Sequence, residues 1–337
     1  MNPEIQTIVH DRVEPSDVPL LQAMGLTRHF RVGGPLSRKV LHAVDDVNLT
    51  IHRGEIVALV GESGSGKSTV ARLLARVYSP TSGRISLQGQ LLGTIRPRGY
   101  RKLVQMVFQD PYSSLNPIFR ASHGVLRALK LHRDIRGGAK REEIAIGILE
   151  SVGLHPAGEL IKKYPHELSG GQRQRFGFAQ AIACDPVLIL ADEPVSMLDV
   201  SIRLGVLNLM DDLRKTHGVS MLYITHDIAS ARYIADRVLV MYAGRVVEQG
   251  PTESVLQEPK HPYTQLLLSA VPDPYAQDDV SATTDVAEPP RVINPGEGCR
   301  FRPRCPLAIP VCWEITPPLR PVARAHDAAC HVTARGA

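Results

Sequence analysis

One stretch of glycines and hydroxyl residues constrains the fold of this chain more than any other part of its sequence. Residues Gly61–Thr69 read Gly-Glu-Ser-Gly-Ser-Gly-Lys-Ser-Thr, and they follow the apolar run Ile56–Val60. Because Val70–Ala75 suits a helix, this order predicts a strand, a glycine loop and a helix. It is the context in which the pattern G-x-x-x-x-G-K-[ST] forms a phosphate-binding P-loop.

The chemistry of such a loop depends on its backbone as well as on two side chains. Glycines let backbone N–H groups turn toward an anion, and the N-terminus of the following helix adds positive potential. We expect Lys67 to reach the β- and γ-phosphates and the Ser68 hydroxyl to ligate Mg²⁺. A glycine-rich turn that holds its lysine by chance is the alternative. The predicted nucleotide-binding residues of the loop are Gly61, Ser63, Gly64, Ser65, Gly66, Lys67, Ser68 and Thr69.

Composition narrows the class of protein. Hydrophobic residues make up 43% and charged residues 22% of the 337 residues, as in an ordinary globular protein. The net charge of +5 comes from scattered Lys and Arg, so we expect no nucleic-acid partner, although a surface beside an anionic membrane would carry the same charge. No apolar stretch approaches the roughly 20 residues that span a bilayer, and Met1–Pro19 lacks the apolar core of a signal peptide. We therefore expect a protein that is cytosolic or bound peripherally to a membrane.

Patterns of apolar residues predict the organisation of the rest of the chain. Residues 1–20 lack periodicity and are interpreted as a loose leader. Alternating apolar residues within Leu21–Ile51 predict antiparallel strands, and an apolar face predicts helix over Ala121–Leu154. Val238–Gln249 is typical of a β-hairpin. The acidic, proline-bearing stretch Asp273–Pro290 is interpreted as a linker.

An acidic pair follows a second apolar run. Val187–Ala191 is typical of a strand that is buried on both faces, and it leads directly into Asp192 and Glu193. Carboxylates at the C-terminal end of a parallel strand lie where α/β sheets bind ligands. We expect Asp192 to hold Mg²⁺ through water and Glu193 to polarise the attacking water. A lone Asp-Glu is more often a solvated strand end, but the apolar run and the P-loop upstream argue against that here.

Three weaker signals have both a functional and a structural interpretation. Ser169 is a suitable N-cap for a helix, and the two glycines after it leave amides open to an anion, although Ser-Gly-Gly is also a common flexible loop. His226 follows a strand predicted over Ser220–Ile224 and is placed to contact a γ-phosphate, although most lone histidines are surface or core residues. Phe30 is either an exposed ring that stacks on a base or a core phenylalanine.

In combination, these motifs resemble the nucleotide-binding subunit of an ABC transporter. Their order along the chain is the P-loop, Gln109 after a strand, Leu-Ser-Gly-Gly-Gln at Leu168–Gln172, Asp192 and Glu193, the Ser196–Asp199 segment and His226. The resemblance covers residues 21–272 and implies an ABC ATPase domain there. The implied fold is α/β: a P-loop ABC ATPase core, with a RecA-like mixed sheet and an antiparallel β subdomain, plus a helical signature subdomain over about residues 110–184.

The resemblance also implies a role for each matched residue. Phe30 looks like the aromatic residue that stacks on adenine. Gln109 looks like the residue that touches Mg²⁺ and relays the nucleotide state to the membrane subunit. Glu193 looks like the catalytic base, Asp199 like the D-loop aspartate and His226 like the switch histidine.

The signature implies that the working unit is larger than this chain. Ser169, Gly170 and Gly171, with Gln172 beside them, look like the segment that binds the γ-phosphate of ATP held by the opposite subunit. Because this segment acts in trans, the resemblance implies a head-to-tail dimer with two sandwiched ATP molecules.

Four segments are similar to the peptide importer branch of the family: Phe108–Pro117, Tyr164–Leu168, His261–Thr264 and Gly298–Pro306. This branch pairs two different ATPase subunits with two integral-membrane permease subunits and an extracytoplasmic solute-binding protein. The similarity therefore implies a peripheral position on the cytoplasmic face of the inner membrane. The branch handles di- and oligopeptides but also nickel and oligosaccharides, so the sequence does not name the solute.

A soluble ABC ATPase of translation or DNA repair is the second hypothesis. Such proteins usually fuse two ATPase halves or carry a coiled-coil insertion, whereas this chain has one half and no heptad run. A redox sensor that uses the C-terminal cysteines is the third.

Four of the five cysteines lie in the C-terminal extension, which with the linker spans residues 273–337. The spacing of Cys299, Cys305, Cys312 and Cys330 is C-x5-C-x6-C-x17-C, without the tight knuckle of most zinc sites. Four thiolates on a proline-stiffened loop suit a 4Fe–4S cluster at least as well, and free thiols are the remaining alternative. The resemblance to the importer tail favours the cluster, in a structural role. Cys184 is interpreted as an ordinary buried thiol.

Overall fold

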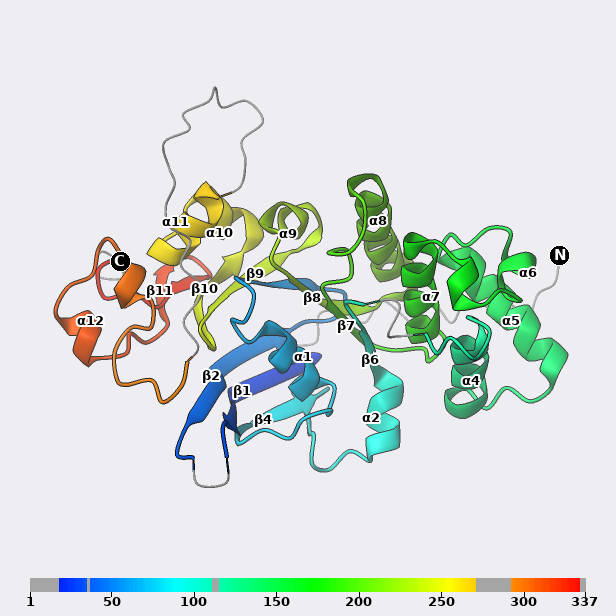
Figure 1. The fold of residues 1–337 in the computed structure, drawn as a ribbon, viewed down its shortest axis with the longest axis horizontal. Helices are drawn as coiled ribbons and strands as arrows, with labels where there is room; N and C mark the ends of the chain where they lie inside the picture. Colours follow the sequence, from blue (N-terminus) through cyan, green and yellow to red (C-terminus); the bar gives the residue numbers. More distant parts are fainter. Residues whose placement is uncertain (1–17, 35–36, 111–114, 271–291, 334–337) are drawn as a thin grey trace.

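Two sheets and a layer of helices position the functional site (Figure 1). The computed structural model describes residues 18–34, 37–110, 115–270 and 292–333. Most of the predicted leader (residues 1–20) and the predicted linker (Asp273–Pro290) lie outside the described residues. Among the described residues, no helix has both the length and the apolar character that crossing a membrane requires.

The larger sheet runs through the middle of the molecule in the order β11-β12-β10-β9-β3-β8-β7-β6. Every residue of β3 (Ile56–Val60), β7 (Leu188–Asp192) and β8 (Ser220–Thr225) is buried, and these strands pair in parallel. A parallel strand is apolar throughout because helices cover both faces of its sheet, which confirms the sequence interpretation. The other strands are β6 (Val104–Val107), β9 (Arg237–Tyr242), β10 (Arg245–Pro251), β11 (Arg320–Ala323) and β12 (His326–Ala328).

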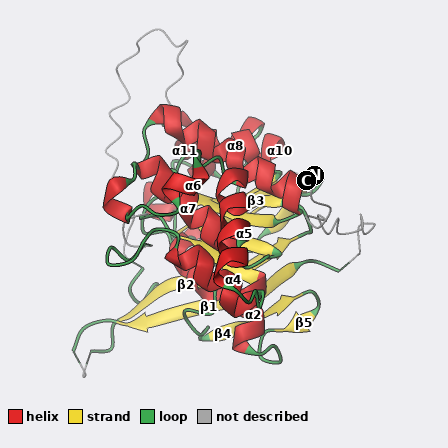
Figure 2. Ribbon diagram, turned by 90° about the vertical axis from the view of Figure 1, so that its right-hand side faces the viewer, coloured by secondary structure: helices red, strands yellow, loops and turns green. Residues whose placement is uncertain are grey.

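The smaller sheet is antiparallel, as the alternating sequence predicts. Its order is β2-β1-β4-β5, and Figure 2 shows it below the larger sheet. The predicted hairpin also forms, because β9 and β10 pair antiparallel around Ala243 and Gly244. The strands of the smaller sheet are β1 (Leu21–Arg31), β2 (Val40–Ile51), β4 (Ser82–Leu87) and β5 (Gln90–Leu91).

Helix α1 (Lys67–Leu74) lies between the two sheets and follows directly on the glycine loop. Val57 and Leu59 of β3 share its core, whereas the alternate residues of the same strand face the core on the other side of the sheet. That second core includes the apolar face of α8 (Val200–His217). Both ends of the glycine loop are therefore attached to rigid, fully buried elements.

The helical region beyond β6 differs in one respect from the sequence prediction. The pattern over Ala121–Leu154 predicts helix, and the structure divides it into α4 (His123–His132) and α5 (Gly138–Ser151). The break holds Asp134 and Gly137, whose φ angles of 52° and 87° are left-handed and incompatible with a continuous helix. The other helices are α2 (Pro97–Leu103), α6 (Ala157–Leu160), η1 (Pro165–Glu167), α7 (Gly170–Ile182), α9 (Ile228–Ile234), α10 (Thr252–Gln257), α11 (Pro262–Ser269), η2 (Arg302–Arg304) and α12 (Val311–Glu314).

The C-terminal segment joins the larger sheet. Strand β12 pairs antiparallel with β10, and β11 pairs with β12 at the edge (Figure 1). Glu248 of β10 is fully buried and accepts a hydrogen bond from His326 of β12, with 2.7 Å between Oε1 and Nε2. The same carboxylate accepts the backbone N–H groups of Lys260 and His261, at 2.7 and 2.9 Å. A buried carboxylate needs such partners, so the tail strand completes the polar bonding of the sheet interior.

Candidate nucleotide-binding site

The glycine loop between β3 and α1 is as tight as its sequence predicts. Gly66 is the residue before α1 and has a φ angle of 107°, which L side chains rarely adopt. A Cβ atom at Gly66 would lie 2.2 Å from the carbonyl oxygen of Ala43 on β2. The loop therefore passes too close to the smaller sheet for any residue other than glycine.

Lys67 is held inside the loop. Its side chain is 4% exposed, and its Nζ donates to the carbonyl oxygens of Gly61 and Glu62 at 2.7 and 2.9 Å. Burial lowers the pKa of Lys67, while the carboxylates of Glu193 and Asp192 act in the opposite direction. A buried ammonium group beside backbone carbonyls is a point charge available to an anionic group of a ligand.

Ser68 and Asp192 form the next part of the site. Asp192 ends β7 with 3% exposure, and its Oδ1 accepts a hydrogen bond of 2.8 Å from the Ser68 hydroxyl. Burial raises the pKa of Asp192, and the bond from Ser68 offsets part of that rise. A hydroxyl and a buried carboxylate side by side are the oxygen donors that Mg²⁺ prefers, so the residues present fit this ion.

Glu193 lies one residue beyond Asp192 and receives two polar neighbours. Its Oε2 accepts a hydrogen bond of 2.8 Å from Nε2 of Gln109, and it lies 3.3 Å from Nδ1 of His226. The φ angle of Glu193 is 46°, a left-handed conformation that is uncommon outside glycine and often marks a functional site. The ends of three parallel strands thus bring the predicted base, the predicted Mg²⁺ contact and the predicted switch residue together.

One cavity of about 740 Å³ runs along this site, and Asp192 lies behind its lining, bonded to Ser68. Of the sequence-predicted positions it is lined by Ser63, Gly64, Gly66, Lys67, Ser68, Thr69, Gln109, Glu193 and His226. The predicted loop residues Gly61 and Ser65 lie behind the lining, and Ser65 is 1% exposed. The sequence reasoning missed the rest of the wall, which consists of Leu41, His42, Ala43, Gly244 and Val292.

Phe30 is not among the residues that line this cavity. It lies opposite Leu41 in the register of β1 and β2, and it is Leu41 that lines the wall. The ring of Phe30 is half-buried, with the Arg28 guanidinium 4.6 Å from its centroid and Tyr78 edge-on at 5.6 Å. The structure therefore gives Phe30 aromatic and cationic neighbours within the chain.

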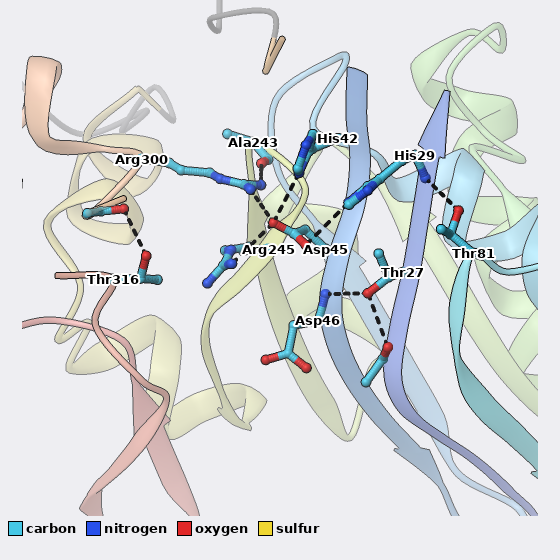
Figure 3. A network of polar contacts seen from close by, with 12 residues as sticks. Thr27, His29, His42, Asp45, Asp46, Thr81, Ala243, Arg245, Arg300 and Thr316 are labelled. Carbon is cyan, nitrogen blue, oxygen red and sulfur yellow. Dashed lines mark hydrogen bonds and ion pairs between the residues drawn. The ribbon is translucent and has the colours of Figure 1, made fainter. Parts of the chain in front are cut away.

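A polar network behind the outer wall ties the cavity to the C-terminal segment (Figure 3). Asp45 of β2 pairs with Arg245 of β10 at 3.1 Å and with Arg300, which also donates to the carbonyl of Ala243. Burial would raise the pKa of Asp45, but these arginines outweigh it and hold the pKa at about 2. The ring of His42 stacks near His29, and burial lowers the pKa of His42.

The same network includes the one group of described residues whose ligand atoms are close enough for a metal ion. His29, His42 and Asp45 present atoms that lie within 4.8 Å of one another. The charge of Asp45 is, however, already compensated by two arginines. We interpret this group as a structural polar network.

The predicted signature residues lie apart from this cavity. Ser169 caps α7, accepting the backbone N–H of Gln172 at 3.2 Å while its own N–H donates to the Gln172 side chain at 3.0 Å. This capping box confirms the N-cap prediction. Ser169 is exposed, as is Asp199 at the start of α8. These residues do not line the chain's own nucleotide cavity.

The four C-terminal cysteines form one group of free thiols. Burial raises the pKa of the Cys299 and Cys305 thiols, and Cys312 acts on both of them electrostatically. Cys305 also interacts with Cys330. Within the described part of the chain, no three of these sulfur atoms lie within 4.8 Å of one another, whereas a tetrahedral Zn–S site spaces them by about 3.8 Å. Cys184 is buried, which confirms that prediction and raises the pKa of its thiol to about 11.

Comparisons with known proteins agree with this site. The sequence model of the ABC transporter family matches residues 44–196, and that of the oligopeptide/dipeptide transporter C-terminal region matches residues 247–312. A probable peptide ABC transporter ATP-binding protein, y4tS of Sinorhizobium fredii, is 43% identical over 327 residues, which cover 94% of this chain and 91% of that protein. The putative oligopeptide transport ATP-binding protein YkfD of Bacillus subtilis is 41% identical over 320 residues, which cover 94% of this chain and 96% of that protein.

Solved structures show the same fold. The ATP-binding cassette MJ0796, in a dimeric post-hydrolysis state bound to ADP and phosphate, matches with a TM-score of 0.61 and 28% identity over 69% of this chain and 98% of that chain. CbiO1 of Clostridium perfringens, part of the ABC transporter complex cbiONQ, matches with a TM-score of 0.62 and 27% identity. The match covers 72% of this chain and 92% of that chain. The nucleotide of the site is accordingly ATP with Mg²⁺. The chain belongs to the ATP-hydrolysing proteins of the ABC transporter family and carries the C-terminal region of the oligopeptide/dipeptide transporters.

Proposed function

We propose that this chain energises an ABC importer for di- and oligopeptides. The observation that carries the proposal is the joint presence of a cavity lined by the P-loop, Gln109, Glu193 and His226 and of a C-terminal region of the oligopeptide/dipeptide type. Relatives over nearly the whole chain are described as peptide and oligopeptide transport ATP-binding proteins. Import of nickel or oligosaccharides is the alternative within the same class.

The geometry supports a role for each residue at the phosphate end of the cavity. Lys67 would contact the β- and γ-phosphates, and Ser68, Asp192 and Gln109 would hold Mg²⁺, which would supply charge compensation to the phosphates. Glu193 would accept a proton from the attacking water, and the hydrogen bond from Gln109 and the contact with His226 orient it for that task. His226 contacts the γ-phosphate. Stacking of Phe30 on adenine stays a prediction.

We also propose that the catalytic unit is a head-to-tail dimer whose second ATPase subunit is a different chain. Ser169, Gly170, Gly171 and Gln172 lie outside the chain's own cavity, with Asp199 at a neighbouring exposed helix start. Such a placement suits contact with ATP held by another subunit. The solved MJ0796 cassette, which binds ADP and phosphate, is dimeric.

Two integral-membrane permease subunits and an extracytoplasmic solute-binding protein complete the proposed transporter. A groove of about 310 Å³ lies beside α4 and α6, shortly after Gln109 in the chain. Three apolar side chains on it are unusually exposed, Ile118 at 77%, Phe119 at 45% and Tyr164 at 39%. We assign this groove to a helical segment of a permease subunit. The chain then lies peripherally at the cytoplasmic face of the inner membrane.

For the four C-terminal cysteines we propose a 4Fe–4S cluster in a structural role, with zinc as the alternative. Their thiols act on one another electrostatically, and among the described residues no three of the sulfur atoms lie within 4.8 Å of one another, a spacing that suits a cluster better than a single tetrahedral ion. In the same proposal, residues 21–272 form the ATPase domain and residues 273–337 its linker and cysteine-rich extension. Iron and zinc quantification on anaerobically purified protein tests the cluster. Stoichiometric zinc without iron would refute it.

Reconstitution in proteoliposomes tests the transport function. The chain is combined with its partner ATPase, the permease subunits and the solute-binding protein, and ATP hydrolysis is followed with and without peptide. Peptide-loaded binding protein is expected to stimulate hydrolysis and to drive peptide uptake, with ADP in place of ATP as the control. Stimulation by nickel or an oligosaccharide alone would favour those alternatives. A stable dimer that binds ribosomes or DNA and no permease would refute the importer.

A further inference from the structure

An arginine of the cysteine-bearing segment reaches the phosphate-binding loop. Arg304, at the end of η2, donates from both terminal nitrogens to the two carboxylate oxygens of Glu62, each at 2.9 Å. The two side chains are only 15% and 17% exposed. A bidentate, largely buried pair of this kind fixes the relative position of the two backbones. It joins segments that are 242 residues apart.

Glu62 is bonded at every polar group that it carries. Its backbone carbonyl accepts the ammonium group of Lys67 at 2.9 Å, and its backbone N–H donates to the hydroxyl of Tyr263 on α11 at 2.9 Å. Its side chain accepts Arg304. Glu62 is thus held in place by Arg304 of the C-terminal segment. A shift of the Glu62 backbone would move the carbonyl oxygen that Lys67 contacts.

The charge of Glu62 makes the pair more than a mechanical tie. Glu62 is a carboxylate inside a loop that binds polyphosphate, and like charges in a largely buried setting repel strongly. Arg304 of the C-terminal segment compensates this charge through its bidentate ion pair. Glu62 does not line the cavity, but its charge acts on the buried Lys67 ammonium. Loss of the arginine would leave an unpaired carboxylate in the phosphate-binding loop, and loss of both charged side chains would remove the repulsion again.

We propose that Arg304 is a positioning residue of the nucleotide site, which neutralises Glu62 and holds the phosphate-binding loop in its nucleotide-accepting geometry. The proposal rests on the proposed assignment of the cavity to ATP. It makes the C-terminal segment a working part of the nucleotide site of its own subunit, since Val292 of the same segment also lines the cavity.

Neighbouring arginines of the segment serve as comparisons. Arg302 lies in the same turn, but its guanidinium stacks on Trp313 at 5.0 Å and donates to the carbonyl of Glu297. Arg302 thus stabilises the tail itself without touching the loop. Substitution of Arg302 therefore measures how a less stable C-terminal segment affects nucleotide binding. Substitution of Arg304 measures the same effect plus the loss of the contact with Glu62.

Equilibrium binding of N-methylanthraniloyl-ADP to the full chain tests the proposal. Arg304→Ala is expected to weaken binding roughly tenfold, because the carboxylate of Glu62 then repels the phosphates. Glu62→Gln is expected to change the affinity by at most about threefold, since the repelling carboxylate charge is gone while Arg304 remains. The affinity of the double variant, with Glu62→Gln and Arg304→Ala combined, is expected to return to within about threefold of the wild-type affinity. A purely structural role of Arg304 would not produce this rescue.

Arg302→Ala, iron content and the thermal midpoint are measured in parallel as controls for tail folding. The proposal is overturned if Arg304→Ala binds like the wild type, if the double variant is as weak as Arg304→Ala, or if Arg302→Ala weakens binding equally. Lys67→Ala separates this result from a failure of the proposed function. If the wild type and Lys67→Ala bind alike, the cavity itself is wrongly assigned.

Discussion

The two ends of the nucleotide cavity are built in different ways. The phosphate end comes from one continuous stretch, Ser63–Thr69, together with the ends of neighbouring parallel strands. The outer end combines Leu41–Ala43 of β2, Gly244 of the β9–β10 turn and Val292 ahead of the cysteines. The phosphate end binds charge through backbone groups, which requires a fixed local sequence. The outer end offers shape, which distant segments supply equally well.

The difference predicts where substitutions hurt most. Groups that touch the reacting phosphate have no substitute, because charge and geometry must both be correct. Residues of the outer wall share their contact area with neighbours, so the loss of one methyl group is partly made up by the others. The three predictions below probe this contrast, from the largest expected effect to the smallest.

At the phosphate end, Glu193→Gln removes the proton acceptor and keeps the shape of the side chain. In the presence of the partner ATPase, we expect ATP hydrolysis at the site of this chain to fall by about 10²–10⁴-fold, while ATP binding is retained and the closed dimer of the two chains accumulates. Phosphate release and gel filtration with ATP measure the two effects. Turnover at the wild-type rate would contradict the assignment of Glu193 as the base.

A buried histidine, His261, packs against Phe301 of the C-terminal segment, which supplies Val292 to the outer end of the cavity. Protonation of this histidine should lower the free energy of unfolding. His261 is 1% exposed, its Nδ1 accepts the N–H of Tyr263, and burial lowers its pKa to about 4. The unfolded chain binds the proton near pH 6.5, so stability is complete above that pH and is lost as the pH falls toward 4. We expect the free energy of unfolding to drop by about 2 kcal/mol at pH 5 through this residue.

Urea unfolding at pH 7 and pH 5 measures this loss. His261→Asn keeps a side chain that can cap α11 but does not titrate, and it should lack this part of the pH dependence. Asp45, with a pKa of about 2, titrates below the window and does not confuse the comparison. An equal loss of stability in the wild type and in His261→Asn would contradict the prediction.

At the outer end, Val292→Ala shortens one side chain of the wall. We expect nucleotide affinity to fall only about threefold, in line with the loss of a small part of an apolar contact. Lys67→Ala in the same titration provides the comparison, with an expected loss of roughly 100-fold for a buried cation that contacts phosphate. Equal losses for the two variants would erase the distinction between the ends.

Most of the fold and the whole phosphate end follow from local sequence. The apolar runs Ile56–Val60 and Val187–Ala191 are buried strands because a parallel sheet demands them, and glycine at Gly66 is required by its close approach to β2. The break between α4 and α5 had one signal in the sequence, the pair Gly137 and Gly138, which the apolar pattern on either side outweighed, whereas Asp134 gave no signal because aspartate is compatible with many conformations. Strands β11 and β12 are four and three residues long, too short to show a period.

The outer end could not be predicted for a different reason. Leu41, His42 and Val292 carry no chemical signature, and only the folded sheet brings them to one wall. Phe30 carries an aromatic signature, yet it is its cross-strand partner Leu41 that is among the lining residues, and stacking of Phe30 on adenine stays a prediction. The contact of Arg304 with Glu62 links segments 242 residues apart in the sequence. Periodic patterns report only local structure, so they cannot predict such a contact.

That separation has a consequence during synthesis of the chain. The ribosome makes Glu62 first and Arg304 242 residues later, a delay of roughly 12–48 s at about 5–20 residues per second. Throughout that interval the emerging phosphate loop carries an unpaired carboxylate. On the proposed role of Arg304, nucleotide reaches its full affinity only once residue 304 is in place, and a polypeptide cut short before it is expected to bind nucleotide about as weakly as Arg304→Ala.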